Sequence, residues 1–294
     1  MNKTKVGIIG TGNIGTDLLL KLNKSKYLEC SIFIGRNPES KGIKIAESMG
    51  IKTSFESIKV IEDNPECCDI VFDATSAGAH KIHAPILKKL GKFTIDLTPA
   101  KIGKMCVPYI NLNECLNEYN VNLITCGGQA TLPIAYTISK LYPDTEYIEI
   151  VASIASKSAG VGTRNNIDEF TQTTKDALKQ FTKVKKTKAI ITLNSAEPPM
   201  TMRNTVYALI ENVNMDVIKS EIYKTAECVK KYVPNYKIVA GPIFENGKLA
   251  VTIEVNGAGD YLPKYAGNLD IITCAAIEVA EKYVQKKEEG TINE

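Results

Sequence analysis

A cysteine followed by two glycines gives the clearest chemical signal in this chain. The apolar run from Val121 to Ile124 is typical of a strand, and Cys126, Gly127 and Gly128 follow it closely. Apolar residues then recur at helical spacing, at Ala130, Ile134, Ala135, Ile138 and Leu141. The pattern therefore predicts a strand, a cysteine, a tight turn and a helix.

A thiol at the start of a helix lies in the positive potential of backbone N–H groups that have no helical partner. That potential lowers the pKa of a thiol and favours the thiolate as a nucleophile. The same N–H groups can bind the oxyanion that forms when a thiolate attacks a carbonyl. The alternative is a small buried cysteine that packs before a tight turn. This stretch alone supports the catalytic and the packing interpretation of Cys126 equally.

The other cysteines and the histidines do not form a metal-binding pattern. The eight cysteines are scattered without a C-x-x-C pair, and the chain has two histidines, His80 and His83. Because the spacing of a zinc site is missing, we predict no metal ion. We expect His80 at the start of a helix and His83 at the surface, and neither as a catalytic base.

A glycine-rich loop near the N-terminus predicts a nucleotide site. Residues Gly10 to Gly15 read G-T-G-N-I-G; they follow a strand expected at Lys5 to Ile9 and precede leucines at helical spacing. In this context the first glycine allows a sharp turn and the second lets the backbone approach a pyrophosphate. The third lets the helix pack on the strand. We therefore predict a dinucleotide-binding domain.

The end of the second expected strand leaves the choice of cofactor open. An NAD site usually has Asp or Glu there to bind the ribose hydroxyls, whereas this chain has Gly35, Arg36 and Asn37 after Ile34. Arg36 is either a surface residue or a group that stacks on the adenine or binds a 2′-phosphate. Asn37 is a neutral substitute for the acid. We predict NAD, with NADP as the alternative.

The order of the expected elements predicts two domains. Up to about residue 125, short apolar strands alternate with helices, which is typical of a doubly wound parallel (Rossmann) sheet. Strands of alternating polarity are then expected at 146–156, 189–193, 237–244 and 248–255, and helices at 167–181, 217–232 and 268–284. They predict a mainly antiparallel sheet with helices on one face. The predicted domains are 1–128 with 268–294, and 129–267.

Composition argues against several classes of function. Among the 294 residues, 44% are hydrophobic and 23% are charged, and the net charge is +3. This balance is ordinary for a globular protein and lacks the basic excess of a nucleic-acid-binding one. No apolar run is long enough to cross a membrane, and the N-terminus has no signal-peptide pattern. We expect a cytoplasmic protein with free thiols.

Six longer motifs run along the chain, at residues 10–17 (GTGNIGTD), 70–77 (IVFDATSA), 95–100 (IDLTPA), 125–131 (TCGGQAT), 154–164 (IASKSAGVGTR) and 257–270 (GAGDYLPKYAGNLD). Together they closely resemble those of acylating, CoA-dependent acetaldehyde dehydrogenase. That enzyme is the partner of 4-hydroxy-2-oxovalerate aldolase in the catabolism of aromatic compounds. The resemblance extends over about residues 5–280 in the same order.

The resemblance implies the fold of glyceraldehyde-3-phosphate dehydrogenase, with a Rossmann domain and an α+β domain for catalysis and dimerisation. It implies oxidation of acetaldehyde, or another short aldehyde, to acetyl-CoA with NAD and CoA, through a thioester on Cys126. It also implies a homodimer and an aldolase partner. The cofactor-binding residues that it implies are Thr11, Gly12, Asn13, Ile14, Ser158, Ala159, Gly160, Val161, Gly162, Thr163, Arg164, Asn165, Asn166 and Asn268.

Three positions depart from the family pattern. Asn37 stands where an aspartate is frequent, Asn204 replaces the aspartate of an Arg-Asp-Thr-Val-Tyr motif, and Val161 replaces a frequent proline. Asn204 cannot transfer a proton as an acid can, although it can orient a neighbour by hydrogen bonds. Two alternatives therefore stay open: a reductase that converts a bulkier activated acid in a biosynthetic pathway, and a non-catalytic subunit that stabilises an aldolase.

Overall fold

The computed structural model describes residues 3–160, 164 and 167–291. The chain divides into two compact units, Met1–Leu123 with Thr273–Glu294, and Ile124–Ile272. Each unit is built around its own sheet, and each is described below by itself.

The first unit contains a sheet of seven strands in the order β3-β2-β1-β4-β5-β7-β6. Every neighbouring pair is parallel. The strands are β1 (Thr4–Ile9), β2 (Leu28–Ile34), β3 (Thr53–Ser54), β4 (Ile70–Asp73), β5 (Phe93–Asp96), β6 (Lys104–Met105) and β7 (Asn120–Asn122). The order reverses between β1 and β4, and in such sheets ligands bind at the carboxyl ends of the strands beside this switch point. The predicted Rossmann sheet is confirmed.

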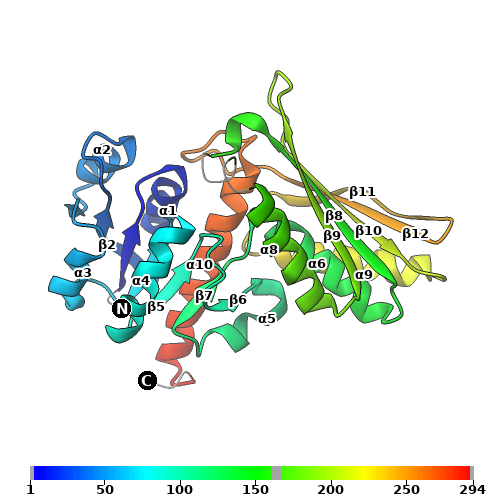
Figure 1. Cartoon of the computed structure of the whole chain (residues 1–294), viewed down its shortest axis with the longest axis horizontal. Helices are drawn as coiled ribbons and strands as arrows, with labels where there is room; N and C mark the ends of the chain where they lie inside the picture. The colour runs from blue at the N-terminus through cyan, green and yellow to red at the C-terminus, as the bar shows by residue number, and fades with distance from the viewer. Residues whose placement is uncertain (1–2, 161–163, 165–166, 292–294) are drawn as a thin grey trace. The chain divides into compact units, whose positions relative to one another are not determined.

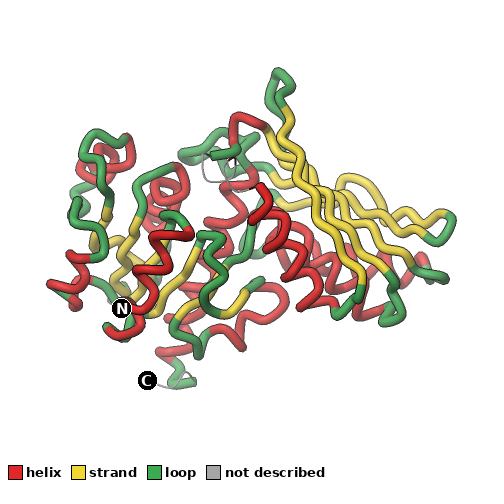
Figure 2. The backbone as a smooth tube through the Cα atoms, in the orientation of Figure 1, coloured by secondary structure: helices red, strands yellow, loops and turns green. Residues whose placement is uncertain are grey.

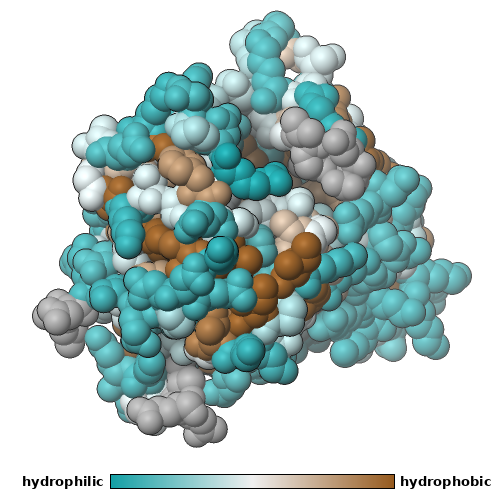
Figure 3. All heavy atoms as spheres, turned by 60° about the vertical axis from the view of Figure 1, so that its left-hand side comes forward, coloured by the Kyte–Doolittle hydropathy of each residue, from teal (hydrophilic) through white to brown (hydrophobic). Residues whose placement is uncertain are grey.

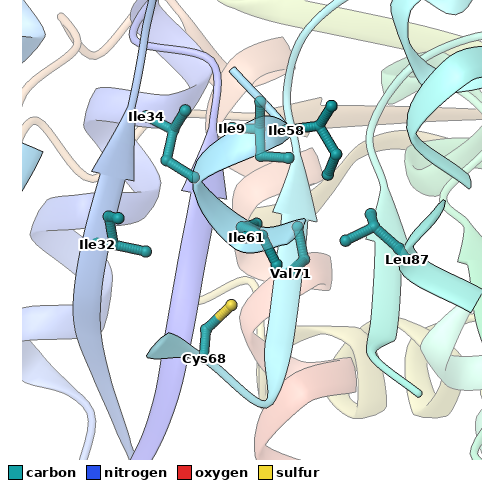
Figure 4. Packing of buried hydrophobic residues seen from close by; sticks show 8 residues of the cluster. All are labelled: Ile9, Ile32, Ile34, Ile58, Ile61, Cys68, Val71 and Leu87. Carbon is teal, nitrogen blue, oxygen red and sulfur yellow. The ribbon is translucent and has the colours of Figure 1, made fainter. Parts of the chain in front are cut away.

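Helices cover both faces of this sheet because side chains alternate between the faces along each strand. On one face a buried cluster joins β1, β2 and β4 to α3 (Lys59–Asp63) and α4 (Ala77–Lys89). Figure 4 shows its members, Ile9, Ile32, Ile34, Ile58, Ile61, Cys68, Val71 and Leu87. On the other face Ile8 and Phe33 lie against Gly15 of α1 (Asn13–Lys24) and Gly42 of α2 (Lys41–Ser48).

The remaining helical segments of this unit are η1 (Pro65–Cys67), α5 (Pro108–Cys115) and the later part of α10 (Gly267–Glu288). Tyr283 of α10 stacks on Phe93 with ring centroids 3.9 Å apart, and Thr273 donates to Asp17 of α1 at 2.6 Å. The C-terminal helix therefore completes the packing of a sheet that is formed by the first 123 residues.

The second unit contains five strands in the order β11-β12-β10-β8-β9. They are β8 (Tyr147–Ala155), β9 (Lys186–Asn194), β10 (Met202–Leu209), β11 (Tyr236–Glu245) and β12 (Lys248–Val255). Three pairs are antiparallel, and β8 with β9 is parallel, so the prediction of a mainly antiparallel sheet is confirmed. The sequence interpretation missed the central strand, β10, because its polar start at Arg203, Asn204 and Thr205 hides the apolar alternation.

Three helices, α6 (Cys126–Leu141), α8 (Ile167–Thr182) and α9 (Met215–Lys230), lie on one face of this sheet (Figures 1 and 2). The buried residues Ile148, Ile150, Ala152 and Ile154 alternate along β8 and face them. No described helix covers the opposite face, and a one-sided cover of this kind leaves half of each strand exposed.

The surface agrees with the balanced composition. On the side drawn in Figure 3, hydrophilic side chains cover most of the surface and apolar ones gather in smaller areas between them. None of the helices that the structure describes is long and apolar enough to cross a membrane.

Candidate active site

Cys126 is the first residue of α6, as predicted, and the preceding threonine caps the helix. The Thr125 Oγ1 accepts a hydrogen bond from the Gly128 N–H at 2.9 Å and lies 2.7 Å from the Thr174 Oγ1. Because the Thr174 hydroxyl donates to the Phe170 carbonyl at 2.8 Å, Thr125 donates to Thr174. Both hydrogen-bonding functions of the cap are thus used, and α8 holds the first turn of α6 in place.

The helical turn that follows Cys126 packs tightly against its neighbours at Gly127. A Cβ atom on Gly127 would stand 3.1 Å from the Phe170 ring of α8 and 3.3 Å from the Ala152 Cβ of β8. Both separations are shorter than ordinary contacts between carbon atoms. Gly127 therefore lets the N-terminus of α6 approach the sheet. This close approach fixes the position of the neighbouring Cys126 relative to β8.

A strained residue precedes the cap. Ile124 has a φ of 65° and is buried, although a β-branched residue rarely adopts the left-handed region. Such a conformation is destabilising by about 1–3 kcal/mol and persists where the surrounding packing enforces it, often at functional sites. The sequence predicted a regular strand here, but β7 ends at Asn122, and the reversal at Ile124 turns the chain into α6.

The electrostatics of Cys126 differ from the prediction. The side chain is half-buried, and burial raises the pKa of its thiol to about 12. Hydrogen bonds from the backbone of Gly127 and of Cys126 itself lower the pKa by less. The helix N-terminus acts in the expected direction, but the net shift is upward because desolvation of the thiolate is the larger effect. In the protein alone, Cys126 is a neutral thiol at neutral pH.

A short loop follows β8, which passes Gly127 at Ala152. The turn η2 (Ser156–Ser158) is closed by the Ser158 hydroxyl, which donates to the Ala155 carbonyl at 2.9 Å. Arg164 donates to the Ser156 carbonyl at 2.5 Å and, through Nε, to the Ala159 carbonyl at 3.2 Å.

Asn268, in the first turn of α10, also binds this loop. Its Nδ2 donates to the Ser158 carbonyl at 3.2 Å. Its side-chain oxygen is buried and has no hydrogen-bond partner among residues 3–160, 164 and 167–291. The loop and the helix are therefore held together, and they present one buried acceptor that a ligand with an N–H group can satisfy.

Asn204 is a second buried amide with unused hydrogen-bonding capacity. It is fully buried on the helix-covered face of β10, in register with Ala152 of β8, the residue that lies against Gly127. Neither its Nδ2 nor its Oδ1 has a partner in the described part of the chain. A buried amide without hydrogen bonds lowers the free energy of unfolding, so its presence beside the Cys126 turn indicates a role other than stability.

The glycine loop of the first unit has the geometry that a dinucleotide requires. Gly10 has a φ of 113°, and a Cβ there would stand 2.5 Å from the Ala74 carbonyl oxygen. A Cβ on Gly15 would stand 1.8 Å from the Gly10 carbonyl oxygen, so α1 packs directly on the loop. A Cβ on Gly12, the N-cap of α1, would meet nothing within 4 Å. The open side of the loop thus exposes the helix N-terminus to a phosphate.

A cavity of about 410 Å³ adjoins this loop, a volume in the usual range for a ligand site. Most of its lining comes from the carboxyl ends of β1 and β2 and from the loops after β1, β2 and β4, as the topology predicts, and the rest from Ser57 and from α4. They are Ile9, Gly10, Thr11, Ile34, Gly35, Arg36, Asn37, Ser57, Thr75, Ser76, Ala79 and His83. The cavity, the open Gly12 and the N-terminus of α1 fit a nicotinamide dinucleotide.

One wall of the cavity rests on a buried polar network. Asp73 Oδ2 lies 2.8 Å from Nδ1 of both His80 and His83, and His80 Nε2 lies 3.4 Å from Asp96 Oδ2. Asn120 also lies 2.9 Å from His80 Nε2. The expectation that His83 is a surface residue is therefore wrong: a carboxylate within the fold binds its ring and offsets the penalty of burying it.

The network shifts the pKa values of Asp73, His80 and Asp96. Burial acts against each charged form, but hydrogen bonds from both histidines hold the pKa of Asp73 far below its usual range, and Asp73 and Asp96 raise the pKa of His80. For Asp96 burial outweighs its partners and raises the pKa to about 6. Both histidines bind Asp73 through Nδ1, so they have a structural role beside the cavity in the first unit. No described cluster of His, Cys, Asp and Glu has the composition of a metal site.

Comparison with known proteins decides the family. Residues 126–263 match the family described as "Prokaryotic acetaldehyde dehydrogenase, dimerisation", and residues 5–116 match "Semialdehyde dehydrogenase, NAD binding domain". An acetaldehyde dehydrogenase of Geobacillus stearothermophilus is 54% identical over 289 residues, with 98% of each chain covered. One of Spirochaeta aurantia is 49% identical over 285 residues, covering 97% of this chain and 96% of the relative. The chain belongs to the prokaryotic acetaldehyde dehydrogenase family.

A solved structure with a similar fold supports the architecture of this acetaldehyde dehydrogenase family member. Aspartate semialdehyde dehydrogenase II of Vibrio cholerae matches with a TM-score of 0.64, covering 97% of this chain and 99% of that one, at 12% sequence identity. At that identity the likeness concerns the fold alone. The fold consists of a parallel sheet in the NAD-binding domain and a second, mixed sheet.

The structure brings together some of the residues that the family resemblance implies. Thr11 lines the cavity, and Gly12, Asn13 and Ile14 form the cap and first residues of α1. Ser158, Ala159, Gly160, Arg164 and Asn268 lie in or near the loop after β8 and at the start of α10. The other predicted contacts, Val161, Gly162, Thr163, Asn165 and Asn166, fall outside the described residues.

The raised pKa of Cys126 predicts slow alkylation that accelerates with pH. With iodoacetamide at about pH 7.5, the cofactor-free protein should be modified more slowly at Cys126 than at Cys228, an exposed cysteine on α9. The Cys126 rate should still rise at about pH 10, because the thiolate fraction grows about tenfold per pH unit below the pKa. Peptide mapping measures both sites in one sample. A Cys126 rate that levels off below about pH 8 would contradict the assignment of a neutral thiol.

The unpaired amide of Asn204 predicts a stabilising substitution. Asn204→Leu should raise the free energy of unfolding by about 1–3 kcal/mol, because it removes a buried polar group that has no partner. Urea denaturation measures the change. Val206→Leu is the matched control, since Val206 is equally buried on the same face of β10. That control adds volume without removing an amide, so it should destabilise. A loss of stability in Asn204→Leu as large as in the control contradicts the interpretation.

Proposed function

We propose that this chain oxidises acetaldehyde to acetyl-CoA with NAD and CoA, and that Cys126 carries the acyl group as a thioester. The observation that carries the proposal is the position of the thiol. Cys126 is the first residue of α6, with backbone N–H groups directed at its sulfur and a strained residue before its cap. The family membership supports the choice of an aldehyde as substrate.

The first chemical step is attack of the Cys126 sulfur on the aldehyde carbon. Because burial raises the pKa of the thiol to about 12, the proton leaves as the carbon–sulfur bond forms, and a water molecule or the aldehyde oxygen receives it. The product is a thiohemiacetal whose oxygen carries negative charge until it is protonated. The N–H groups of the first turn of α6 are suited to bind that oxygen.

The second step converts the thiohemiacetal into the thioester on Cys126. The carbon loses a hydride and the oxygen gives its proton to a water molecule, so the carbon is oxidised from the aldehyde to the acyl level. The nicotinamide, when bound, accepts the hydride. From the family resemblance, we assign the pyrophosphate to Thr11, Gly12, Asn13 and Ile14, and the nicotinamide end to residues 158–166 with Asn268. The buried side-chain oxygen of Asn268 can accept from a carboxamide N–H.

The last step returns Cys126 to its free form. The CoA thiolate attacks the thioester carbonyl, the carbon–sulfur bond to Cys126 breaks, and acetyl-CoA leaves. A cysteine suits this sequence because its thiolate is both a good nucleophile and a good leaving group. The N–H groups at the start of α6 again face the oxygen that becomes negative during the attack.

We also propose that the active form is a homodimer built on the sheet of the second unit. Residues 126–263 match a family described by its dimerisation. The face of this sheet without described helices exposes Leu209 of β10 and Ile243 of β11. Apolar side chains on an uncovered sheet face are typical of an interface between subunits.

Two parts of the proposal rest on other grounds. The aldolase partner, and with it a place in the catabolism of aromatic compounds, rests on the sequence resemblance alone. A cytoplasmic location is supported by the eight cysteines, which all lie in the described part of the chain and form no disulfide, because thiols persist in reducing compartments.

Steady-state assays test the proposed reaction. With acetaldehyde and NAD, formation of the reduced cofactor should depend on CoA, and Cys126→Ser should lower the rate by at least about a thousandfold because the nucleophile is lost. Cys228→Ser is the control, since that exposed thiol lies outside the site. Turnover that does not need CoA, or that survives in Cys126→Ser, contradicts the proposal.

A panel of aldehydes separates the alternatives in the same assay. Acetaldehyde and propionaldehyde should be the good substrates. If only a bulkier acyl group is converted, the biosynthetic reductase is the correct assignment. If no substrate is converted while the protein still binds and stabilises an aldolase, the non-catalytic subunit is correct.

A further inference from the structure

We propose that the cofactor cavity of the first unit accepts a phosphate on the 2′ carbon of the adenine ribose, so that this chain binds NADP at least as tightly as NAD. The inference rests on the proposed function in one respect, that the cavity beside Gly10 is the dinucleotide site. It concerns the residues at the end of β2, where the two cofactors differ.

None of the described residues that line the cavity is an Asp or Glu. Arg36 is the cationic side chain among them. An NAD site normally places Asp or Glu at the end of the second strand, where it accepts hydrogen bonds from the ribose hydroxyls. In this chain β2 ends at Ile34, and Gly35, Arg36 and Asn37 take that place.

Asn37 is a weaker acceptor than a carboxylate, and it carries no charge. Its Oδ1 accepts a hydrogen bond from the Glu39 N–H at 3.0 Å, and its backbone carbonyl accepts from the Ser40 N–H at 3.2 Å. One lone pair of Oδ1 and the Nδ2 donor stay available to a ligand. Unlike Asp or Glu at this place, Asn37 does not repel a phosphate and can donate a hydrogen bond to it.

Arg36 adds a cation at the same place. It is exposed at the rim of the cavity, and neither a hydrogen bond nor an ion pair joins it to another residue in the described ranges. A guanidinium group binds phosphate through two parallel hydrogen bonds, which is the usual way in which a 2′-phosphate is accommodated. Arg36 can turn toward such a ligand without breaking an existing interaction.

The carboxylates of Glu39 and Asp73 already have partners. Glu39 forms an ion pair with Lys44 at 2.7 Å. Asp73 is fully buried, and it accepts from Nδ1 of His80 and His83 and from the Thr75 N–H. Neither carboxylate is among the described residues that line the cavity.

Ser57 and His83 supply polar groups on another wall of the cavity. The Ser57 Oγ lies 3.5 Å from His83 Nε2, the ring nitrogen that Asp73 does not bind. Ser57 has a φ of 54°, which is uncommon for a residue other than glycine and is frequent where a side chain is held for a ligand. Ser57 and His83 thus add polar side chains to the lining of the cavity.

Calorimetric titration with adenosine fragments tests the proposal without the dehydrogenase reaction. The wild-type protein should bind 2′,5′-ADP at least about tenfold more tightly than 5′-AMP, the gain expected from a charge-assisted contact. Arg36→Ala should lower the affinity for 2′,5′-ADP by about 10- to 100-fold and change that for 5′-AMP by less than about threefold. Asn37→Asp should act in the same direction, because it adds a negative charge beside the phosphate.

Two controls make the result specific. Lys41→Ala removes an equally exposed cation from the start of α2 that does not line the cavity. An equal loss of 2′,5′-ADP affinity there would show that general charge attraction, not a site, is responsible, and would overturn the proposal. Equal binding of 3′,5′-ADP, the fragment found in CoA, would overturn the assignment to the 2′ position.

The outcome is independent of the proposed reaction. If 2′,5′-ADP binds no more tightly than 5′-AMP while NAD and CoA still support aldehyde oxidation, the cofactor inference fails and the proposed function stands. If the fragments bind as expected but no aldehyde is oxidised, the proposed function fails and the cofactor inference stands.

Discussion

The position of one sulfur atom depends on how closely the first turn of α6 can approach the sheet beneath it. Gly127 packs tightly between Phe170 and Ala152, where a Cβ atom would stand only 3.1 and 3.3 Å from them, and the Thr125 cap is hydrogen-bonded to Thr174. Ile124 adopts a left-handed conformation so that the chain can reverse before the helix. These contacts stabilise the strained backbone that precedes Cys126. The position of the thiol at the helix N-terminus therefore depends on the packing of α6 against α8 and β8.

A position at the start of a helix does not by itself make Cys126 a thiolate, because two opposite electrostatic effects act on its sulfur. A charge at a helix terminus gains typically 0.3–1 kcal/mol and up to about 2 kcal/mol in favourable, partly buried geometries. Desolvation can shift a pKa by about 3–5 units, which is the larger effect and explains the raised pKa of the thiol. The helix therefore contributes most when charge forms on the sulfur or on a bound oxygen during the reaction. In the proposed reaction, the thiol therefore stays neutral until it attacks the substrate.

The sequence predicted those features that depend on local patterns. The parallel sheet follows from apolar strands alternating with helices, and the glycine loop and the helix at Cys126 follow from short motifs with strong geometric requirements. Features that depend on tertiary contacts were missed or wrong. β10 lies at the centre of its sheet despite a polar start, and His83 is buried because Asp73, ten residues earlier, binds it. The turn at Asn37 and the strain at Ile124 have no signature in residue type.

The proposed reaction makes Cys126 the residue to which the acyl group is bound, and trapping that group tests the claim most directly. Protein mixed with acetaldehyde and NAD in the absence of CoA should gain the mass of one acetyl group, located on Cys126 by peptide mapping. Addition of CoA should remove it, and Cys126→Ser should gain nothing under the same conditions. An acyl group found on another cysteine, or one that persists after CoA is added, would contradict the account.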